Sequence, residues 1–312
     1  MDKDINEQEH QEQEEKKGKG CFSPGCLVVV VAALALTYYG FVMPGKELPV
    51  ISLAAELIPI NLPIPGFDHG IPNTLPTAIM TSLILIIIAL FYNRAVKKAE
   101  RTGTESRFLI TVDAIYEAVY SFVATTVGQE KAGIFFPLIG SFFFFILLSN
   151  WSGLLPGMGS IGIWHEHHGH LELIPIFRSP TADLSTTVGL ALITQVTAQY
   201  YGFKFQGAKY LKKYFNFSAG PDSGFLKPLL AGANGFAGIL ELMGEFIKVI
   251  SFAFRLFGNV FAGEVLLMVI SFLTAFLVVD VFYALELFVG AIQALIFSIL
   301  SLIFYQMATQ HH

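Results

Sequence analysis

The sequence predicts an all-α, polytopic membrane protein with about six hydrophobic segments, the last two forming a long, tilted helical hairpin. Three observations favour this fold class. Hydrophobic residues account for 54% of the 312 positions and charged residues for only 14%, whereas a soluble domain carries about 25% charged residues. The mean hydropathy is +0.61. Several apolar runs reach the roughly 20 residues that a membrane-spanning helix needs.

The expected membrane segments follow one another along the chain. They cover residues 27–43, 75–93, 134–155, 183–202, 236–276 and 281–308. The fifth segment is too long for one perpendicular span, so we expect it to tilt strongly or to begin in the interface. Residues 109–127 are apolar at intervals but carry Asp113 and Glu117, which favours an amphipathic helix lying on the membrane over a span.

The chain ahead of the second segment divides by composition. Residues 1–26 form a polar tail that we expect to be disordered, because seven acids meet four lysines in the first twenty positions. Residues 27–43 are an extra transmembrane anchor or the apolar part of a signal peptide. No clean small-residue cleavage site follows Tyr39, which favours the anchor. Residues 44–74, rich in Pro and Gly, are an expected outward loop, and residues 75–312 form the membrane domain.

Lysine and arginine residues predict the topology, because they gather in cytoplasmic loops. Five follow the second segment, at positions 94, 97, 98, 101 and 107, and five lie in the loop 203–228. The loop 156–182 has a single one, Arg178, and should face outward. Lysines also precede the first segment. Both termini are therefore expected in the cytoplasm, with the chain in the cell inner (plasma) membrane. The net charge of −5 excludes a basic nucleic-acid surface.

The C-terminal third carries the residues on which a functional hypothesis depends. A charge at the centre of a bilayer costs about 2.5–3.5 kcal/mol on insertion scales and marks an ion pathway by default. Arg255 stands among phenylalanines, and its guanidinium stays charged. The charged residues between positions 229 and 309 are Glu241, Glu245, Lys248, Arg255, Glu264, Asp280 and Glu286.

Helical phase groups several of these residues. Glu241, Lys248 and Arg255 are spaced by seven, so they share one face, which Asn259 joins. Glu264 is nine residues after Arg255 and lies roughly opposite. An alternative interpretation of Glu241 and Lys248 is that they lie near the interface and extend their charged ends into water.

The last helix repeats this spacing, since Glu286 and Gln293 are also seven apart. An antiparallel hairpin with a turn near 274–280 would bring Arg255 level with Gln293 and Glu264 level with Glu286. Two facing carboxylates repel each other, so at least one is expected to hold a proton, as a proton-passing group should. An alternative role for Gln293 is a side-chain hydrogen bond between two packed helices.

The run from Phe254 to Asn259, continuing to Glu264, resembles the signature of subunit a of F-type ATP synthases. The resemblance covers roughly residues 70–310. Further landmarks that fit the family are Ser149-Asn150, Leu154-Leu155-Pro156, Pro180-Thr181-Ala182-Asp183, Gln293-Ala294 and Tyr305-Gln306-Met307-Ala308.

The resemblance implies a non-catalytic stator subunit whose hairpin faces a rotating ring of c subunits, with b-type peripheral stalk subunits and the rest of the ATP synthase as partners. In that family the arginine matching Arg255 faces the ring carboxylates and separates two half-channels. The residues that match the polar path of the family are Asn259, Glu264, Glu286, Gln293, Glu241 and Ser251. No cofactor and no metal are implied. The expected ion is H⁺ rather than Na⁺, because no sodium-specific ligand cluster is visible.

Three positions depart from the family pattern. Ser152-Gly153 stand where an acid is common, and Ser185 stands where related chains carry asparagine. The pair Glu264 and Glu286 consists of two carboxylates, whereas some relatives have one histidine in the pair. These differences concern the route by which ions reach the ring.

Some other patterns in the sequence allow different interpretations. The histidines between 165 and 170 suit a metal site or a solvated loop that buffers protons, and the loop is favoured. The pattern G-x-G-x-x-G at 157–162 lacks the strand and helix that give it meaning. The alternative function is a secondary ion-coupled transporter or channel in which Arg255 binds an anionic solute. The chain has no internal repeat, which counts against duplicated transporters, and no P-loop, so nucleotide chemistry belongs elsewhere.

Overall fold

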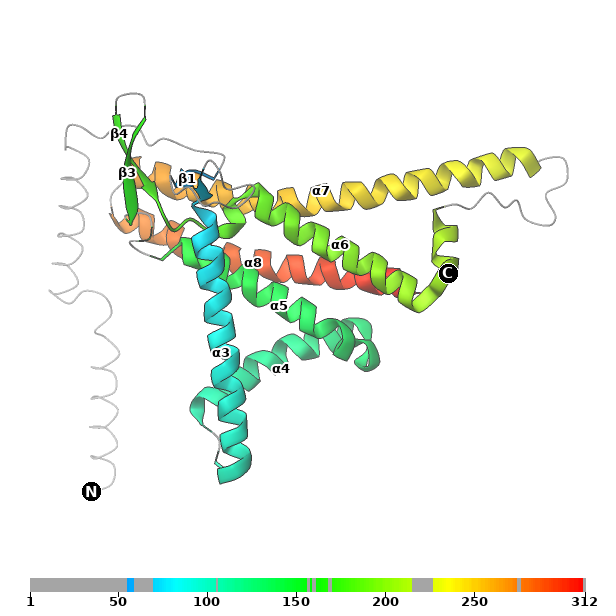
Figure 1. Ribbon diagram of the computed structural model, residues 1–312, viewed down its shortest axis with the longest axis horizontal. Helices are drawn as coiled ribbons and strands as arrows, with labels where there is room; N and C mark the ends of the chain where they lie inside the picture. Colours follow the sequence, from blue (N-terminus) through cyan, green and yellow to red (C-terminus); the bar gives the residue numbers. More distant parts are fainter. Residues whose placement is uncertain are drawn as a thin grey trace, which may run out of the picture. The chain divides into compact units, whose positions relative to one another are not determined.

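The computed structural model describes residues 55–58, 70–104, 106–155, 158, 161–167, 170–214, 227–273 and 276–310. The predicted tail 1–26, the extra segment 27–43 and most of the predicted loop 44–74 lie outside the described residues. Within them the all-α prediction is confirmed. The helices, labelled in Figure 1, are α3 (Thr74–Thr102), α4 (Arg107–Val127), α5 (Gln129–Gly153), α6 (Leu184–Gln206), α7 (Lys227–Leu273) and α8 (Phe276–Thr309).

Short elements connect these helices. Two 3₁₀ helices, η2 (Pro180–Ala182) and η3 (Gly207–Lys213), flank α6. β1 (Leu57–Ile58) pairs antiparallel with β2 (Ile71–Pro72), and β3 (Gly162–His167) pairs antiparallel with β4 (His170–Pro175). The second hairpin lies in the histidine-containing loop, where the sequence had indicated only a loop.

Five of the described helices are long and apolar enough to cross a membrane: Thr74–Thr102, Arg107–Val127, Gln129–Gly153, Gly232–Leu273 and Val278–Thr309. Four of them match predicted segments. The composition of α4 also suits a span, although its acids led us to expect a surface helix, and that placement stays a prediction. α6, which we expected to span, is not among the five. Thr194, Gln195 and Gln199 lie within it and lower its hydropathy.

The described contacts divide the chain into two compact units. One comprises residues 1–51 with 264–285, and the other comprises residues 52–263 with 286–312. Among the predicted site residues only Glu264 belongs to the first unit. The following description concerns the second unit.

The core of the second unit joins α5, α6, α7 and α8. Phe252 and Leu256 of α7 pack with Phe297 of α8, with Phe142 of α5 and with Leu190 of α6. The rings of Phe252 and Phe297 are 4.1 Å apart between centroids. A second cluster joins α4, α5, α6 and α8 through the buried residues Val123, Phe135, Ile139, Ala198, Leu302 and Tyr305. The first cluster packs α7 against α8 on both sides of position 255.

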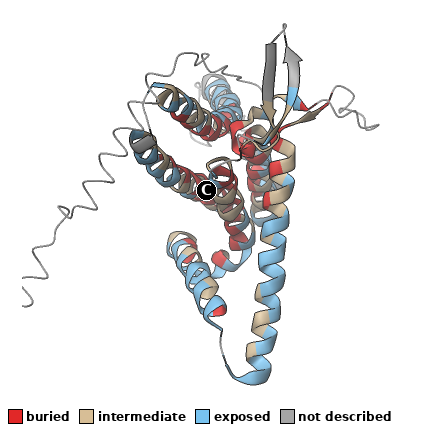
Figure 2. Ribbon diagram, turned by 90° about the vertical axis from the view of Figure 1, so that its left-hand side faces the viewer, coloured by how far each residue is buried: buried red, intermediate tan, exposed pale blue. Residues whose placement is uncertain are grey.

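In α3 polar residues are buried and apolar residues are exposed, which is the reverse of the clusters described above. Its buried residues are Thr74, Thr77 and Thr81, while the isoleucines and leucines farther along are exposed. Figure 2 shows this helix as mostly exposed, with buried positions gathered near its start. The three threonines are spaced by three and four, so they share one face. In a bilayer the apolar face meets lipid, and the threonine face meets the other helices.

Candidate functional site

α7 presents two different faces around Arg255. Phe252, Leu256 and Val260 are buried, whereas Phe254 and Arg255 are exposed. Arg255 makes no hydrogen bond or ion pair with any residue that the structure describes. The guanidinium is therefore on the side of α7 that faces away from the packed helices. A permanently charged group at such a position needs a partner beyond the described residues.

Two contacts fix the register of α7 against α8. Phe252 stacks near Phe297, and the carboxylate of Glu286 lies where a side chain on Gly263 would stand. Positions 252 and 263 are eleven apart, as are 286 and 297, so the two helices run antiparallel with one constant register. In this register Gln293 is level with residue 256, which agrees with the predicted level of Arg255 to within one residue.

The predicted site residues on α8 are buried. Glu286 is 8% exposed and Gln293 is 6% exposed. Glu286 comes so close to α7 because position 263 is a glycine; a Cβ there would overlap the carboxylate. Arg255 and Gln293 are level, yet no hydrogen bond joins them, because Arg255 is on the exposed face.

The other predicted residues of α7 occupy a range of positions. Asn259, Glu264 and Glu241 are half-buried, and Ser251 is exposed. Lys248, which lies seven residues before Arg255 on the same helix, is half-buried. Its Nζ lies 3.1 Å from Oε1 of Glu245 and 5.6 Å from the centroid of the Phe304 ring.

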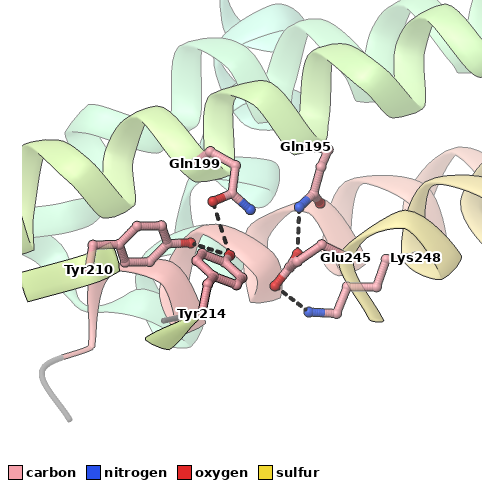
Figure 3. A network of polar contacts seen from close by, with 6 residues as sticks. All are labelled: Gln195, Gln199, Tyr210, Tyr214, Glu245 and Lys248. Carbon is pink, nitrogen blue, oxygen red and sulfur yellow. Dashed lines mark hydrogen bonds and ion pairs between the residues drawn. The ribbon is translucent and has the colours of Figure 1, made fainter. Parts of the chain in front are cut away.

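Glu245 is the centre of a polar cluster that we call the glutamate network, drawn in Figure 3. Gln195 Nε2 donates to Oε2 of Glu245 at 2.5 Å, and Lys248 Nζ donates to Oε1 at 3.1 Å. Nearby, the Tyr214 hydroxyl donates to Oε1 of Gln199 at 3.1 Å. The network comprises Gln195, Gln199, Tyr210, Tyr214, Glu245 and Lys248.

Five residues of the glutamate network line a small, partly open pocket between α6, η3, α7 and α8: Gln195, Gln199, Tyr210, Glu245 and Lys248. The hydroxyls of Tyr210 and Tyr214 lie 3.3 Å apart. Burial, followed by the hydrogen bond to Tyr214 and the negative charges of Glu245 and Glu241, raises the pKa of Tyr210. Its hydroxyl therefore stays protonated at neutral pH. Gly202 makes room for the Tyr210 ring, which seats η3 on α6.

A second polar cluster, which we call the polar seam, joins α3, α5, η2 and the start of α6. Asp183 caps α6 by accepting a hydrogen bond from the Ser185 amide at 3.0 Å, and it accepts another from the Thr74 hydroxyl at 3.1 Å. Asn150 Nδ2 donates to the carbonyl of Gly290 on α8 at 2.9 Å. The seam comprises Asn73, Thr74, Thr77, Ser149, Asn150, Ser179, Thr181 and Asp183.

Comparison with known proteins identifies the family. The family described as ATP synthase A chain matches residues 77–306. The chain belongs to this family. It follows that the chain is a multi-pass membrane protein and a component of an ATP synthase complex.

Similar proteins in this family come from distant bacteria. An ATP synthase subunit a of Syntrophobacter fumaroxidans is 32% identical over 239 residues, which cover 76% of this chain and 85% of the relative. That of Gloeobacter violaceus is 32% identical over 244 residues, covering 78% and 85%. That of Nitrosospira multiformis is 28% identical over 244 residues, covering 78% and 83%.

The sequence did not predict most of the glutamate network. Glu245 was noted as a charged residue without a role, and Gln195, Gln199, Tyr210 and Tyr214 were not considered. The spacing of Glu245 and Lys248, three residues apart on one helix, was the available indication of an ion pair. The two glutamines and two tyrosines give no comparable indication, because their partners lie on other elements.

Proposed function

We propose that the chain is the proton-translocating stator subunit of the F-type ATP synthase membrane sector, with Arg255 as the gate between two half-channels. The observation that carries the proposal is the position of Arg255. It is exposed on a mainly apolar surface, between two buried polar regions that lie before and after it along α7. Glu245 is ten residues before it and Gly263, which contacts Glu286, is eight residues after it, or about 15 Å and 12 Å along a helix.

The surface around Arg255 suits a rotating partner. Phe246, Ile250 and Phe254 are exposed by 62%, 57% and 54% on α7. Large apolar side chains can slide past the apolar helices of a ring, and a lone arginine among them meets each ring carboxylate in turn. Two opposite charges 4 Å apart attract by about 4 kcal/mol at an effective dielectric constant of 20.

The proposed mechanism uses this attraction. A ring carboxylate that arrives opposite Arg255 is stabilised in its charged form, so it releases its proton. The same fixed positive charge repels a proton moving directly from one half-channel to the other. Protons then cross only by occupying ring carboxylates and travelling around with the ring, which couples their flow to rotation.

We assign the polar residues to the two half-channels according to their side of Arg255. Glu286, Gln293, Asn259 and Glu264 serve the outward half-channel, where a buried carboxylate beside Gly263 can accept and pass protons. The cytoplasmic half-channel is assigned to Glu241 and Ser251.

The proposal includes the setting of the protein. The partners are the ring of c subunits and the b-type stalk subunits, and the transported ion is H⁺. Both termini lie in the cytoplasm, and the membrane is the plasma membrane. The charge distribution of the loops and the family membership support these assignments. A transporter acting alone fits the family less well than a stator does.

The test compares ATP-driven acidification of inverted membrane vesicles that contain the complete complex. Arg255→Ala should abolish acidification while the complex assembles at the wild-type level. Arg101→Ala is the matched control, since Arg101 is exposed in the last turn of α3, far along the chain from the hairpin. Undiminished pumping by Arg255→Ala would contradict the proposed gate.

A further inference from the structure

The hairpin of β3 and β4 lies in the segment that connects α5 to η2 (Figure 1). This segment carries four histidines and two glutamates within eight consecutive positions, 165–172. A histidine-rich tract is typical of metal binding, but a specific site needs several ligands held in one place. The sequence favoured a solvated loop because it did not indicate such an arrangement. The pairing of β3 with β4 supplies the missing information.

The register of the two strands decides which residues share a face. His165 is paired with Glu172, and His167 is paired with His170. Residues directly opposite each other in an antiparallel pair lie on the same face, and so do residues two apart on one strand. Three histidines and one glutamate therefore occupy a single face of the hairpin, at the end where the strands connect.

The other face of the hairpin has a different composition. Trp164, Glu166, Leu171 and Leu173 alternate with the residues just named, so they occupy that face. Only Glu166 among these four is of a type that commonly binds a metal ion. The backbone pairing thus gathers metal-binding residue types on one face, although they are mixed with apolar residues along the chain.

The spacing of the four positions suits one metal ion. The Cβ atoms of directly opposite residues lie about 4.5–5.5 Å apart, and residues two apart on a strand are separated by roughly 7 Å. Zinc binds histidine nitrogens at about 2.0–2.1 Å and carboxylate oxygens at about 2.0–2.2 Å. Imidazole and glutamate side chains that start from the corners of such a rectangle are long enough to reach one ion above its centre.

The residue types also indicate which metal the site would take. Imidazole nitrogens suit Zn²⁺, Cu²⁺ and Ni²⁺, whereas Ca²⁺ and Mg²⁺ take oxygen ligands. Cu²⁺ and Ni²⁺ favour planar or tetragonal arrangements. Three imidazoles and one carboxylate fill the four positions of a tetrahedral zinc ion, as in closed structural sites.

The base of the hairpin is fixed by the surrounding fold. The Ile176 amide donates to the carbonyl of Ile161 at 2.9 Å, which continues the pairing beyond β3 and β4. A Cβ on Gly153, at the end of α5, would stand 2.8 Å from the Cβ of Ser179, just before η2. A two-stranded hairpin is only marginally stable by itself, so an ion bound to both strands would stabilise the paired form by mass action.

We propose that the hairpin holds a zinc site formed by His165, His167, His170 and Glu172. The ion links β3 to β4 and fixes their register. The site shares no residue with the proposed gate or with the residues assigned to the half-channels, so zinc binding is expected whether or not Arg255 acts as a gate.

The first experiment titrates the purified complete complex with Zn²⁺ by isothermal titration calorimetry, after dialysis against a chelator. His167→Asn combined with His170→Asn removes two ligands, and the difference from the wild type isolates this site from any other in the complex. Changing a group that merely supports a ligand costs about 10–100-fold in affinity, so we expect a loss of at least about a hundredfold at one site per chain.

Glu166→Gln is the matched control for this titration. It removes a carboxylate next to two of the proposed ligands but on the other face of the hairpin, so it should bind Zn²⁺ like the wild type. Equal binding by the wild type and the double histidine variant would overturn the proposal.

A second variant separates a paired hairpin from an unpaired histidine-rich tract. His170→Leu combined with Leu171→His keeps the composition and the number of histidines but moves one imidazole to the other face. We expect Zn²⁺ affinity to fall by about tenfold or more, because one of four ligands is lost. A tract without fixed pairing would bind Zn²⁺ equally in both chains, and equal affinity would overturn the proposal.

A third measurement reports the geometry of the bound ion. Co²⁺ replaces Zn²⁺ in tetrahedral sites, where its visible absorption is much stronger than in six-coordinate surroundings. The complex with wild-type chain or with Glu166→Gln should show the strong bands, and the double histidine variant should not. Weak, six-coordinate bands in the wild type would show an adventitious ion only and would overturn the tetrahedral site.

Discussion

The glutamate network and the polar seam are both buried polar regions of the second unit, but they are built differently. The network contains an ion pair, Glu245 with Lys248, and each carboxylate oxygen of Glu245 accepts a hydrogen bond. The seam holds one carboxylate, Asp183, together with neutral hydroxyls and amides, and four of its atoms have no described partner. A satisfied network fixes the elements that it joins, whereas an unsatisfied one leaves bonding capacity for water.

The positions of the two regions fit this difference. The network joins α6, η3 and α7 close to Phe304 of α8, and the seam reaches α8 at Gly290. Residues 290 and 304 are fourteen apart, or about 21 Å along the helix, and Gln293 lies between them. We therefore expect changes in the network to affect stability more than changes in the seam.

The largest expected effect is on stability, from Lys248→Met. This change removes the cation and leaves the Glu245 carboxylate buried beside Gln195. Breaking a buried ion pair costs about 3–5 kcal/mol. We expect about 2–3 kcal/mol here, because 29% of the Lys248 side chain is exposed and water can partly replace it. Thermal unfolding of the purified complex measures the loss.

The control for this prediction is the double variant Lys248→Met with Glu245→Gln. Removing both charges should restore most of the stability, since the neutral amide no longer needs a cation. Equal losses in the single and double variants would show that Lys248 acts through its contact with the Phe304 ring instead.

A smaller effect is expected within the seam, where two serines offer a matched pair. Ser179→Ala removes a hydroxyl that bonds to the carbonyl of Ser149 and lies beside the Thr181 hydroxyl, which should cost about 1 kcal/mol. Ser149→Ala removes a hydroxyl with no described partner, so it should leave the unfolding temperature nearly unchanged. The opposite ranking of the two unfolding temperatures would contradict these hydrogen-bond assignments.

The sequence predicted the hairpin well because the relevant information is periodic. The seven-residue spacings of Glu241, Lys248 and Arg255 on one helix, and of Glu286 and Gln293 on the other, fix which residues share a face. One antiparallel register then relates the two helices. The contacts of Phe252 and Glu286 agree with that register. The side of α7 to which Arg255 points did not follow from spacing, because it depends on which neighbours cover the other side.

The two polar regions were harder to predict. Single Gln, Tyr, Ser and Thr residues are scattered over α3, α5, α6 and two 3₁₀ helices. Ser149-Asn150 and Thr181 were landmarks of the resemblance, but no spacing related them to each other or to α3. Thr74 meets Asp183 across 109 positions of the chain. Such pairs arise from tertiary packing, which local patterns do not contain. The threonine spacing on α3 was visible, but the isoleucines around it dominate any measure of hydropathy.

The smallest expected effect is a pH dependence that separates the network from the seam. Burial and the neighbouring Tyr214 raise the pKa of Tyr210 above its value of 10.0 in the unfolded chain. An acid whose pKa is raised by folding contributes stability that is fully present below pH 10 and is lost as the pH rises above it. At pH 10.5 the loss from this one group is on the order of 1 kcal/mol. Tyr210→Phe should lose less stability than the wild type between pH 8 and pH 10.5, as measured by thermal unfolding of the complex. Thr77→Val, which changes no ionisable group, should follow the wild-type curve.

If Tyr210→Phe also followed the wild-type curve, the Tyr210 hydroxyl would ionise as readily in the folded protein as in the unfolded chain. The glutamate network would then be open to water.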